Sequence, residues 1–409
     1  MAQPRPARIL IVDDSAVMRA LLRSVVACDK RLEVAGTASD GASALRALES
    51  LRPDLILLDV EMPVMDGLQT LKQMKARANR IPIIMCSSLT QRGAKVTIEA
   101  LASGAADYVA KPSGQPSRDA AVNALAQDLV PKILALTASA IGSPEPAHAS
   151  VFPPAPVYAS ANVSASVWPS SPAHAPVPHA PSSTLFPAAP QPHLPPQVVS
   201  AVPPAVLLIG VSTGGPAALD VLLPALPANF PLPVLIVQHM PQLFTKLLAE
   251  RLNGHCPLRV AEAAPGDQVR PGTVYIARGD WHMEVATTSA AAASIPVLRL
   301  TQEPPENHCR PAVDVLFRTA VSVYGSRALG VILTGMGYDG LIGSRLIREH
   351  GGTVLAQDQA TSAVWGMPGA VTQAGLAQRV LPIQAIAPEI LRLTGRSQHE
   401  ARALRESAV

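Results

Sequence analysis

A stretch rich in proline divides the chain into two parts that must fold separately. The 41 prolines of the 409-residue sequence are densest between Ser143 and Pro204, where the other residues are mainly Ala, Ser and Val with almost no charge. Such a segment buries too little apolar surface to offset the entropy cost of ordering it. We therefore expect residues 137–204 to be an extended linker, with a reach of roughly 3 Å per residue.

Short apolar strands alternate with helical patterns on both sides of this linker. Residues 7–136 contain five such β-α units, and near-continuous apolar strands are typical of a parallel sheet covered on both faces. Residues 205–395 repeat the alternation, which predicts a second, doubly wound α/β domain with a mainly parallel sheet. Residues 396–409 are expected to form a polar tail. The strands expected in the second domain are Val206–Ile209, Val234–Val237, Leu258–Val260, Thr273–Ile276, Val297–Leu300, Ala328–Leu333 and Gly352–Ala356.

Charge and hydropathy argue against several classes of protein. The net charge of +3 is small and scattered, so we expect no nucleic-acid partner. No apolar run approaches the roughly 20 residues needed to span a bilayer, and Met1 to Arg8 lacks the apolar stretch of a signal peptide. The four cysteines have neither metal-ligand spacing nor a disulfide framework. These features predict a cytoplasmic protein with reduced thiols and no membrane insertion.

Polar residues follow four strands of the first domain. Asp13 and Asp14 follow the first strand, Asp59 the third, Ser87 the fourth and Lys111 the fifth. Ligands bind outside the carboxyl ends of the strands in such sheets. Clustered carboxylates need a divalent cation, most often Mg²⁺, and Asp59 is then able to attack a phosphoryl donor while the cation and Lys111 screen the transferring oxygens. The alternative for Asp14 is a role as a helix N-cap.

This set resembles the response-regulator receiver domain over about residues 7–136. The matching segments are Val12-Asp13-Asp14-Ser15, Leu58 to Pro63, Met65-Asp66-Gly67, Cys86-Ser87-Ser88 and Tyr108 to Pro112. The resemblance implies that Asp59 is the phosphoacceptor and that Ser87, Tyr108 and Lys111 respond to its phosphorylation. It also implies that Asp14, Asp59 and the backbone carbonyl of Glu61 hold Mg²⁺, with Asp13 contributing indirectly.

The second domain begins with a candidate nucleophile. Ile209 to Pro216 follows an apolar strand, precedes a helical pattern and fits G-x-S-x-G, the signature of a serine on a tight strand-to-helix turn, with Ser212 at its centre. A dinucleotide-binding loop requires G-x-G-x-x-G and a P-loop requires a lysine after the glycines, and both are absent. A purely structural turn is the other alternative.

Two further strand ends supply candidate partners for Ser212. His239 ends the next strand and is the leading base, with His282 and His308 as rivals. Asp339 follows a later apolar strand and can hold the imidazole tautomer, as in a serine–histidine–aspartate triad. The alternatives are that Asp339 is an N-cap, or that Asp314 takes its role. The order Ser, His, Asp differs from that of ordinary α/β-hydrolases.

Taken together, the two domains resemble the chemotaxis protein-glutamate methylesterase family, CheB. The segments that carry this resemblance are Gly210 to Gly215, Gln238 to Pro241, Tyr275 to Ala277, Gly279-Asp280, His282-Met283, Arg310 to Phe317, Leu333 to Gly340 and Gly366 to Pro368. The resemblance implies a serine hydrolase that removes methyl esters from receptor glutamates, releases methanol and deamidates certain receptor glutamines. Ser212 would attack, His239 would act as base and then acid, and the backbone N–H groups of Met336 and Thr213 would bind the oxyanion.

The resemblance also implies partners and regulation. The substrates would be methyl-accepting chemotaxis receptors, a histidine kinase would be the phosphodonor, and the hydrolase itself would need no cofactor. An unphosphorylated receiver would cover the cleft until Asp59 is phosphorylated. Two alternatives stay open: a receiver fused to a domain that only binds partners, and an esterase or amidase that acts on another protein.

Overall fold

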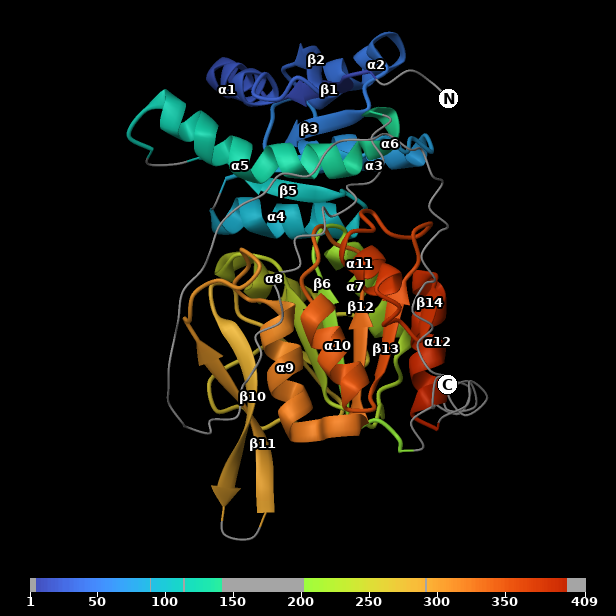
Figure 1. The fold of residues 1–409 in the computed structure, drawn as a ribbon. Helices are drawn as coiled ribbons and strands as arrows, with labels where there is room; N and C mark the ends of the chain where they lie inside the picture. The colour runs from blue at the N-terminus through green and yellow to red at the C-terminus, as the bar shows by residue number, and fades with distance from the viewer. Residues whose placement is uncertain (1–4, 89, 113–114, 142–201, 291–292, 396–409) are drawn as a thin grey trace, which may run out of the picture. The chain divides into compact units, whose positions relative to one another are not determined.

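Two parallel sheets, one in each half of the chain, carry the fold (Figure 1). The computed structural model describes residues 5–88, 90–112, 115–141, 202–290 and 293–395. Most of the predicted linker and the whole predicted tail at 396–409 therefore lie outside the described residues. At the beginning of the predicted linker, residues 138–141 form a short helix.

The N-terminal half contains the five expected strands, each followed by a helix. Its elements are β1 (Ala7–Val12), α1 (Ala16–Val26), β2 (Leu32–Ala38), α2 (Gly41–Leu51), β3 (Leu55–Asp59), α3 (Gly67–Ala76), β4 (Ile83–Ser87), α4 (Gln91–Ala102), β5 (Asp107–Ala110), α5 (Arg118–Leu136) and α6 (Ala138–Ile141).

The sheet of this half has the strand order β2-β1-β3-β4-β5, and all of its strand pairs are parallel. Strands β1, β3, β4 and β5 are therefore neighbours, and their carboxyl ends meet at one edge. Strand β3 is buried along its whole length, as its unbroken apolar run predicts. The prediction that the polar residues after these strands come together is consistent with this order.

The C-terminal half is larger and contains a second α/β layer structure. Its elements are β6 (Val206–Val211), α7 (Gly215–Leu222), η1 (Leu223–Ala225), β7 (Val234–Gln238), α8 (Gln242–Asn253), β8 (Arg259–Glu262), β9 (Thr273–Ile276), β10 (His282–Ala290), β11 (Ala293–Thr301), α9 (Val313–Tyr324), η2 (Gly325–Arg327), β12 (Ala328–Ile332), α10 (Leu341–Glu349), β13 (Thr353–Gln357), α11 (Met367–Gln373), β14 (Arg379–Leu381) and α12 (Ile383–Leu393).

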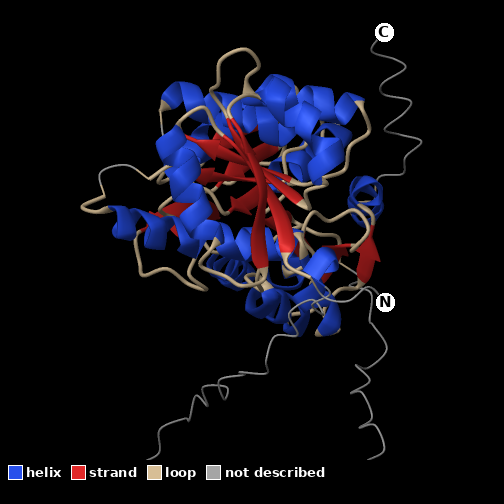
Figure 2. Cartoon of the chain, turned by 90° about the horizontal axis from the view of Figure 1, so that it is seen from above, coloured by secondary structure: helices blue, strands red, loops and turns tan. Residues whose placement is uncertain are grey.

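The order of its main sheet explains where a site can form. The order is β14-β13-β12-β6-β7-β9-β8, and every pair is parallel. From β6 the chain first builds the sheet outward through β7, then returns to add β12 on the other side of β6. Ligand sites in open α/β sheets lie at such a reversal, at the carboxyl ends of the strands. Helices lie on both sides of the strands (Figure 2).

One part of this half differs from the expected parallel sheet. The strand predicted at Val297–Leu300 belongs to β11, which pairs antiparallel with β10 in a separate two-stranded hairpin. The partner strand β10 was not predicted, because its run of Ala, Thr and Ser has weak hydrophobic alternation. Strand β14 was also not predicted, since only three residues form it.

None of the helices in the described part of the chain is both long enough and apolar enough to cross a membrane.

Candidate active site and phosphorylation pocket

Three carboxylates gather at the edge where β1 and β3 end. One ligand oxygen from each of Asp13, Asp14 and Asp59 lies within 4.8 Å of the others. Asp13 and Asp59 are buried, whereas Asp14 is exposed. Ser15, and not Asp14, caps helix α1, so the alternative role of Asp14 as an N-cap does not hold. Hard oxygen donors of this kind fit Mg²⁺.

Lys111 provides a positive charge inside this acidic pocket. Its Nζ lies 2.8 Å from Asp13 Oδ2 and 2.7 Å from Asp59 Oδ1. Burial lowers the pKa of Lys111, but the two carboxylates outweigh this effect and raise the pKa, so the ammonium stays charged. Burial, together with the charge of Asp13, raises the pKa of Asp59 although Lys111 acts to lower it. The pocket is thus short of positive charge, which is the condition under which a divalent cation binds well.

The two other predicted receiver residues lie on the neighbouring strands. Ser87 is buried at the end of β4, where its hydroxyl accepts a hydrogen bond from Thr97 at 2.7 Å. Tyr108 is buried on β5, but its ring packs against Phe244 of the C-terminal half, with 4.4 Å between ring centroids. Lys132 contacts the carbonyl of Tyr108 at 2.8 Å. The structure therefore places Tyr108 at a contact between the halves of the chain.

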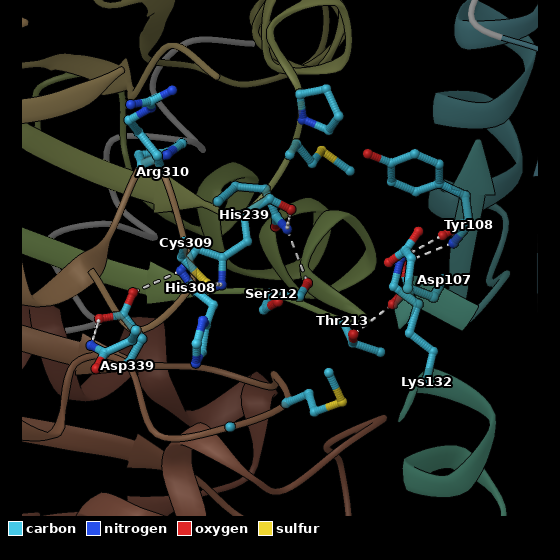
Figure 3. A pocket seen from close by; sticks show the side chains of 18 of the residues that line it. Asp107, Tyr108, Lys132, Ser212, Thr213, His239, His308, Cys309, Arg310 and Asp339 are labelled. Carbon is cyan, nitrogen blue, oxygen red and sulfur yellow. Dashed lines mark hydrogen bonds and ion pairs between the residues drawn. The ribbon is translucent and has the colours of Figure 1, made fainter. Parts of the chain in front are cut away.

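In the C-terminal half, three neighbouring strands end at the predicted hydrolase residues. Ser212 follows β6, His239 follows β7, and Asp339 comes from the loop after β12. Because β7 and β12 flank β6, all three side chains line one cleft of about 730 Å³ (Figure 3). The convergence expected from the strand order is present.

The loop that carries Ser212 needs glycine for two different reasons. Gly214 has φ of 79°, in the left-handed region, where it begins helix α7. A side chain on Gly215 would collide with the amide oxygen of Gln238. Gln238 in turn donates from Nε2 to the carbonyl of Ser212 at 3.0 Å. The turn is thereby fixed against the end of the neighbouring strand β7.

His239 and Asp339 are joined directly. The Nε2 of His239 lies 2.8 Å from Asp339 Oδ2. Asp339 also accepts backbone N–H groups from Val313 at 2.6 Å and Asp314 at 3.1 Å. Burial raises the pKa of Asp339, but His239 and then the two backbone donors outweigh this effect and lower the pKa, so the carboxylate stays charged. Burial lowers the pKa of His239, but the contacts with Asp339 and Cys309 outweigh this effect and raise the pKa to about 10.

The orientation of the His239 ring determines which of its nitrogens is available to accept a proton from Ser212. Because Asp339 occupies Nε2, the nitrogen left to accept a proton is Nδ1, which lies 3.7 Å from the Sγ of Cys309. Within the described part of the chain, the Ser212 hydroxyl forms no hydrogen bond with His239. His239 and Asp339 are thus paired, and Ser212 lines the same cleft.

Two of the three rivals named for the base and the acid, His282 and Asp314, have partners of their own. His282 is buried, accepts the Ala312 N–H at Nδ1 and contacts the Pro304 carbonyl with Nε2. His308 is exposed on the cleft wall. Asp314 accepts from the Gly343 N–H at 2.6 Å. Burial and the charge of Asp339 raise the pKa of Asp314 to about 7.

Asn307 is a residue of the cleft that the sequence did not point to. Its Nδ2 donates to Asp314 Oδ2 and to Asp339 Oδ1, both at 2.9 Å, and so bridges two buried carboxylates. Asn307 adopts φ of 53°, a left-handed conformation that asparagine tolerates better than most residues. The sequence signal was weak, because an isolated asparagine before a histidine has no periodic pattern. We infer that Asn307 is a positioning residue for Asp339.

The predicted oxyanion donors lie at the same cleft. Met336 is exposed on its wall, and Thr213 is buried directly after Ser212. Among the hydrogen bonds of the described residues, none uses the backbone N–H of Met336. The Thr213 hydroxyl, however, donates to Asp107 Oδ2 of the N-terminal half at 2.5 Å.

Comparison with known proteins gives two family matches. The family model described as CheB methylesterase matches residues 207–390, and the one described as response regulator receiver domain matches residues 9–123. A Nocardioides protein named protein-glutamate methylesterase/protein-glutamine glutaminase is 46% identical over 395 residues, covering 96% of each chain. A Maricaulis maris protein of the same name is 45% identical, covering 94% of this chain and 95% of its own. The crystal structure of the Thermotoga maritima CheB methylesterase catalytic domain is 43% identical, covers 47% of this chain and 100% of its own, and has a TM-score of 0.45.

Proposed function

Because the chain belongs to the receiver-linked CheB methylesterase family, we propose that it hydrolyses glutamate methyl esters on chemotaxis receptors and deamidates receptor glutamines. The observation that carries this proposal is the hydrogen bond between His239 and the buried carboxylate of Asp339, one strand away from Ser212. A base oriented by a charged carboxylate beside a serine on a tight turn is the arrangement that acyl transfer requires.

The proposed reaction follows from the roles of these side chains. Ser212 Oγ attacks the ester carbonyl while His239 takes its proton, and Asp339 stabilises the resulting imidazolium. Backbone N–H groups of Met336 and Thr213 stabilise the oxyanion. The C–O bond to the leaving group then breaks, and the proton from His239 converts the methoxide to methanol. Water then attacks the acyl-enzyme while His239 takes its proton, the bond from the acyl carbon to Ser212 Oγ breaks, and His239 returns the proton to Ser212 as the free glutamate leaves. The same steps on a glutamine release ammonia.

We propose that Asp59 accepts a phosphoryl group from a histidine kinase. The carboxylate oxygen of Asp59 attacks phosphorus as the bond to the donor breaks, and Lys111 screens the charge of the transferring oxygens. Asp14, Asp59 and the carbonyl of Glu61 would hold Mg²⁺, with Asp13 contributing indirectly, and the ion would supply further positive charge there. Ser87 is placed on the adjacent strand to hydrogen-bond the new phosphoryl oxygens.

We infer that the receiver controls the hydrolase by contact at the cleft. Asp107 accepts the Thr213 hydroxyl, and the Ala106 carbonyl accepts the Gly214 N–H at 3.0 Å, so both bonds hold the loop beside Ser212. Tyr108 packs on Phe244, and Lys132 also lines the cleft. In this arrangement the receiver would hinder the entry of a receptor helix into the cleft. Phosphorylation of Asp59 would shift the equilibrium toward an open cleft.

The direct test is methanol release from methylated receptor membranes by the full-length protein. We expect release to accelerate when a phosphodonor and Mg²⁺ are added, and we expect Asp59→Ala to show the unstimulated rate under both conditions. Ammonia release from glutamine-containing receptors is measured in parallel. Binding without any release would indicate a partner-binding module instead. Full stimulation of Asp59→Ala would contradict the regulatory half of the proposal.

Replacing Asp107 by alanine should raise the activity without a phosphodonor. The substitution removes a hydrogen bond to a charged group, typically worth about 1.5–3 kcal/mol, from the closed state only. We expect a gain of roughly ten- to hundredfold in methanol release and little further stimulation by the phosphodonor. Asp119→Ala, an exposed position on α5 of the same domain, is the matched control and should behave like the wild type. An Asp107→Ala protein with unchanged basal activity would show that this contact does not restrain the enzyme.

We place this reaction in the cytoplasm. All four cysteines are free, which fits a reducing compartment.

A further inference from the structure

A tight turn holds the thiol of Cys309 against the catalytic histidine. Glu306 and Cys309 exchange two backbone hydrogen bonds, at 3.1 and 2.9 Å, around Asn307 and His308. Both central residues have positive φ, of 53° and 62°, as a two-residue turn of this kind requires. The side chain of Asn307 anchors the turn to Asp314 and Asp339. Cys309 is therefore held in place by the backbone, independently of any contact of its own side chain.

A second anchor fixes the other side of the turn. Arg318 on α9 forms a two-pronged ion pair with Glu306, at 3.0 and 2.8 Å. The position of Cys309 relative to His239 is thus set by two separate elements, helix α9 and the end of β7. A pair of side chains held in this way loses little conformational entropy when it binds a ligand.

The separation of the two side chains suits one particular kind of ligand. Cys309 Sγ and His239 Nδ1 lie 3.7 Å apart. Zinc binds sulfur at about 2.3 Å and imidazole nitrogen at about 2.0–2.1 Å in tetrahedral geometry, which places such a pair of ligand atoms roughly 3.6 Å apart. The distance that the protein already maintains is therefore the distance that the metal needs.

The hydrogen-bond partner of the His239 ring also matches that of a metal-bound histidine. Histidines that bind metals usually donate their other ring N–H to a carboxylate, which fixes the tautomer. Here Asp339 takes Nε2 at 2.8 Å, which leaves the lone pair of Nδ1 directed toward Cys309. Ligand atoms of His239, Cys309 and Asp339 all lie within 4.8 Å of one another. The remaining coordination positions would face the cleft that both residues line (Figure 3).

We propose that His239 and Cys309 form an inhibitory binding site for Zn²⁺ or a similar thiophilic divalent cation. On binding, the S–H bond of Cys309 is replaced by an S–Zn bond and its proton is released, while Nδ1 of His239 donates its lone pair to the ion. No oxidation or reduction takes place. The nitrogen that should accept the proton of Ser212 is then occupied, so hydrolysis stops. This last consequence depends on the proposed function, whereas binding of the metal does not.

Binding is tested first, with Co²⁺ as a spectroscopic probe on the full-length protein. Coordination by a thiolate gives an intense sulfur-to-cobalt absorption band, which we expect from the wild type and from Cys256→Ser. Cys256 is a matched control, because it is also half-buried and follows His255. The band should disappear in Cys309→Ser, and Zn²⁺ should displace it in the wild type.

Inhibition is tested next, with each protein compared with its own zinc-free rate of methanol release. We expect Zn²⁺ to inhibit the wild type and Cys256→Ser, and a chelator to restore the rate. In Cys309→Ser, the zinc concentration for half inhibition should rise by at least about tenfold.

The same cobalt band in Cys309→Ser and the wild type would mean an adventitious ion only. Cobalt binding at Cys309 with full activity under zinc would overturn the inhibitory role. A wild type that binds cobalt but releases no methanol without zinc would refute the proposed function and leave the metal site standing.

Discussion

Replacing Ser212 by alanine is expected to lower methanol release from methylated receptors by at least about 10⁴-fold. Ser212 lies on the turn after β6, at the reversal of strand order and beside the His239–Asp339 pair. Removing the nucleophile of a hydrolytic triad leaves only the contribution of the oxyanion donors and of substrate binding. The measurement is methanol release in the presence of a phosphodonor, with thermal unfolding to show that the fold is retained.

The matched control for this substitution is Ser322→Ala. Ser322 is an exposed serine on α9 whose hydroxyl donates to the Arg318 carbonyl of its own helix. Its loss should leave the rate within a factor of about two. If Ser212→Ala retained the wild-type rate, Ser212 would not be the nucleophile and the assignment of this cleft would be wrong.

Replacing Asp339 by asparagine should have the second largest effect, a fall of about 10³–10⁴-fold in kcat. An amide N–H₂ facing His239 would turn Nε2 into an acceptor and place the ring proton on Nδ1. Nδ1 could then no longer take the proton of Ser212. The effect should appear in kcat much more than in KM, since the substitution changes a tautomer and not the shape of the cleft.

Asp314→Asn separates this prediction from the alternative that Asp314 is the orienting acid. Burial and the charge of Asp339 raise the pKa of Asp314 to about 7, so this carboxyl is already uncharged in much of the protein near neutral pH. A neutral amide at this position should therefore cost about tenfold or less in kcat. A larger loss for Asp314→Asn than for Asp339→Asn would reverse the two assignments.

The strand ends were the part of the site that the sequence could predict. In a parallel sheet, residues directly after neighbouring strands must meet at one edge, so Ser212, His239 and Asp339 could be brought together without coordinates. The same reasoning gathered Asp13, Asp59 and Lys111 in the first domain. Unbroken apolar runs with a fixed order of connections make such predictions robust, because few topologies are compatible with them.

Residues outside these strand ends could not be predicted in the same way. Asn307 and Cys309 reach His239 from a turn whose conformation depends on two consecutive positive φ angles and on an ion pair to α9. The orientation of the imidazole depends on which of its nitrogens meets Asp339, and no sequence pattern records that choice. The pairing of Asp107 with Thr213 joins residues of different domains, for which periodicity gives no signal.

Strand β5 connects two events that must be coordinated. Asp107, at its first residue, holds Thr213, while Lys111, directly after its last residue, contacts Asp59. Four residues of extended chain span only about 13 Å and have almost no slack along their length. A displacement of Lys111 along the strand is therefore transmitted to Asp107 at the other end of β5. A phosphoryl group on Asp59 that displaced Lys111 would therefore also displace Asp107 and, through it, the loop that carries Ser212.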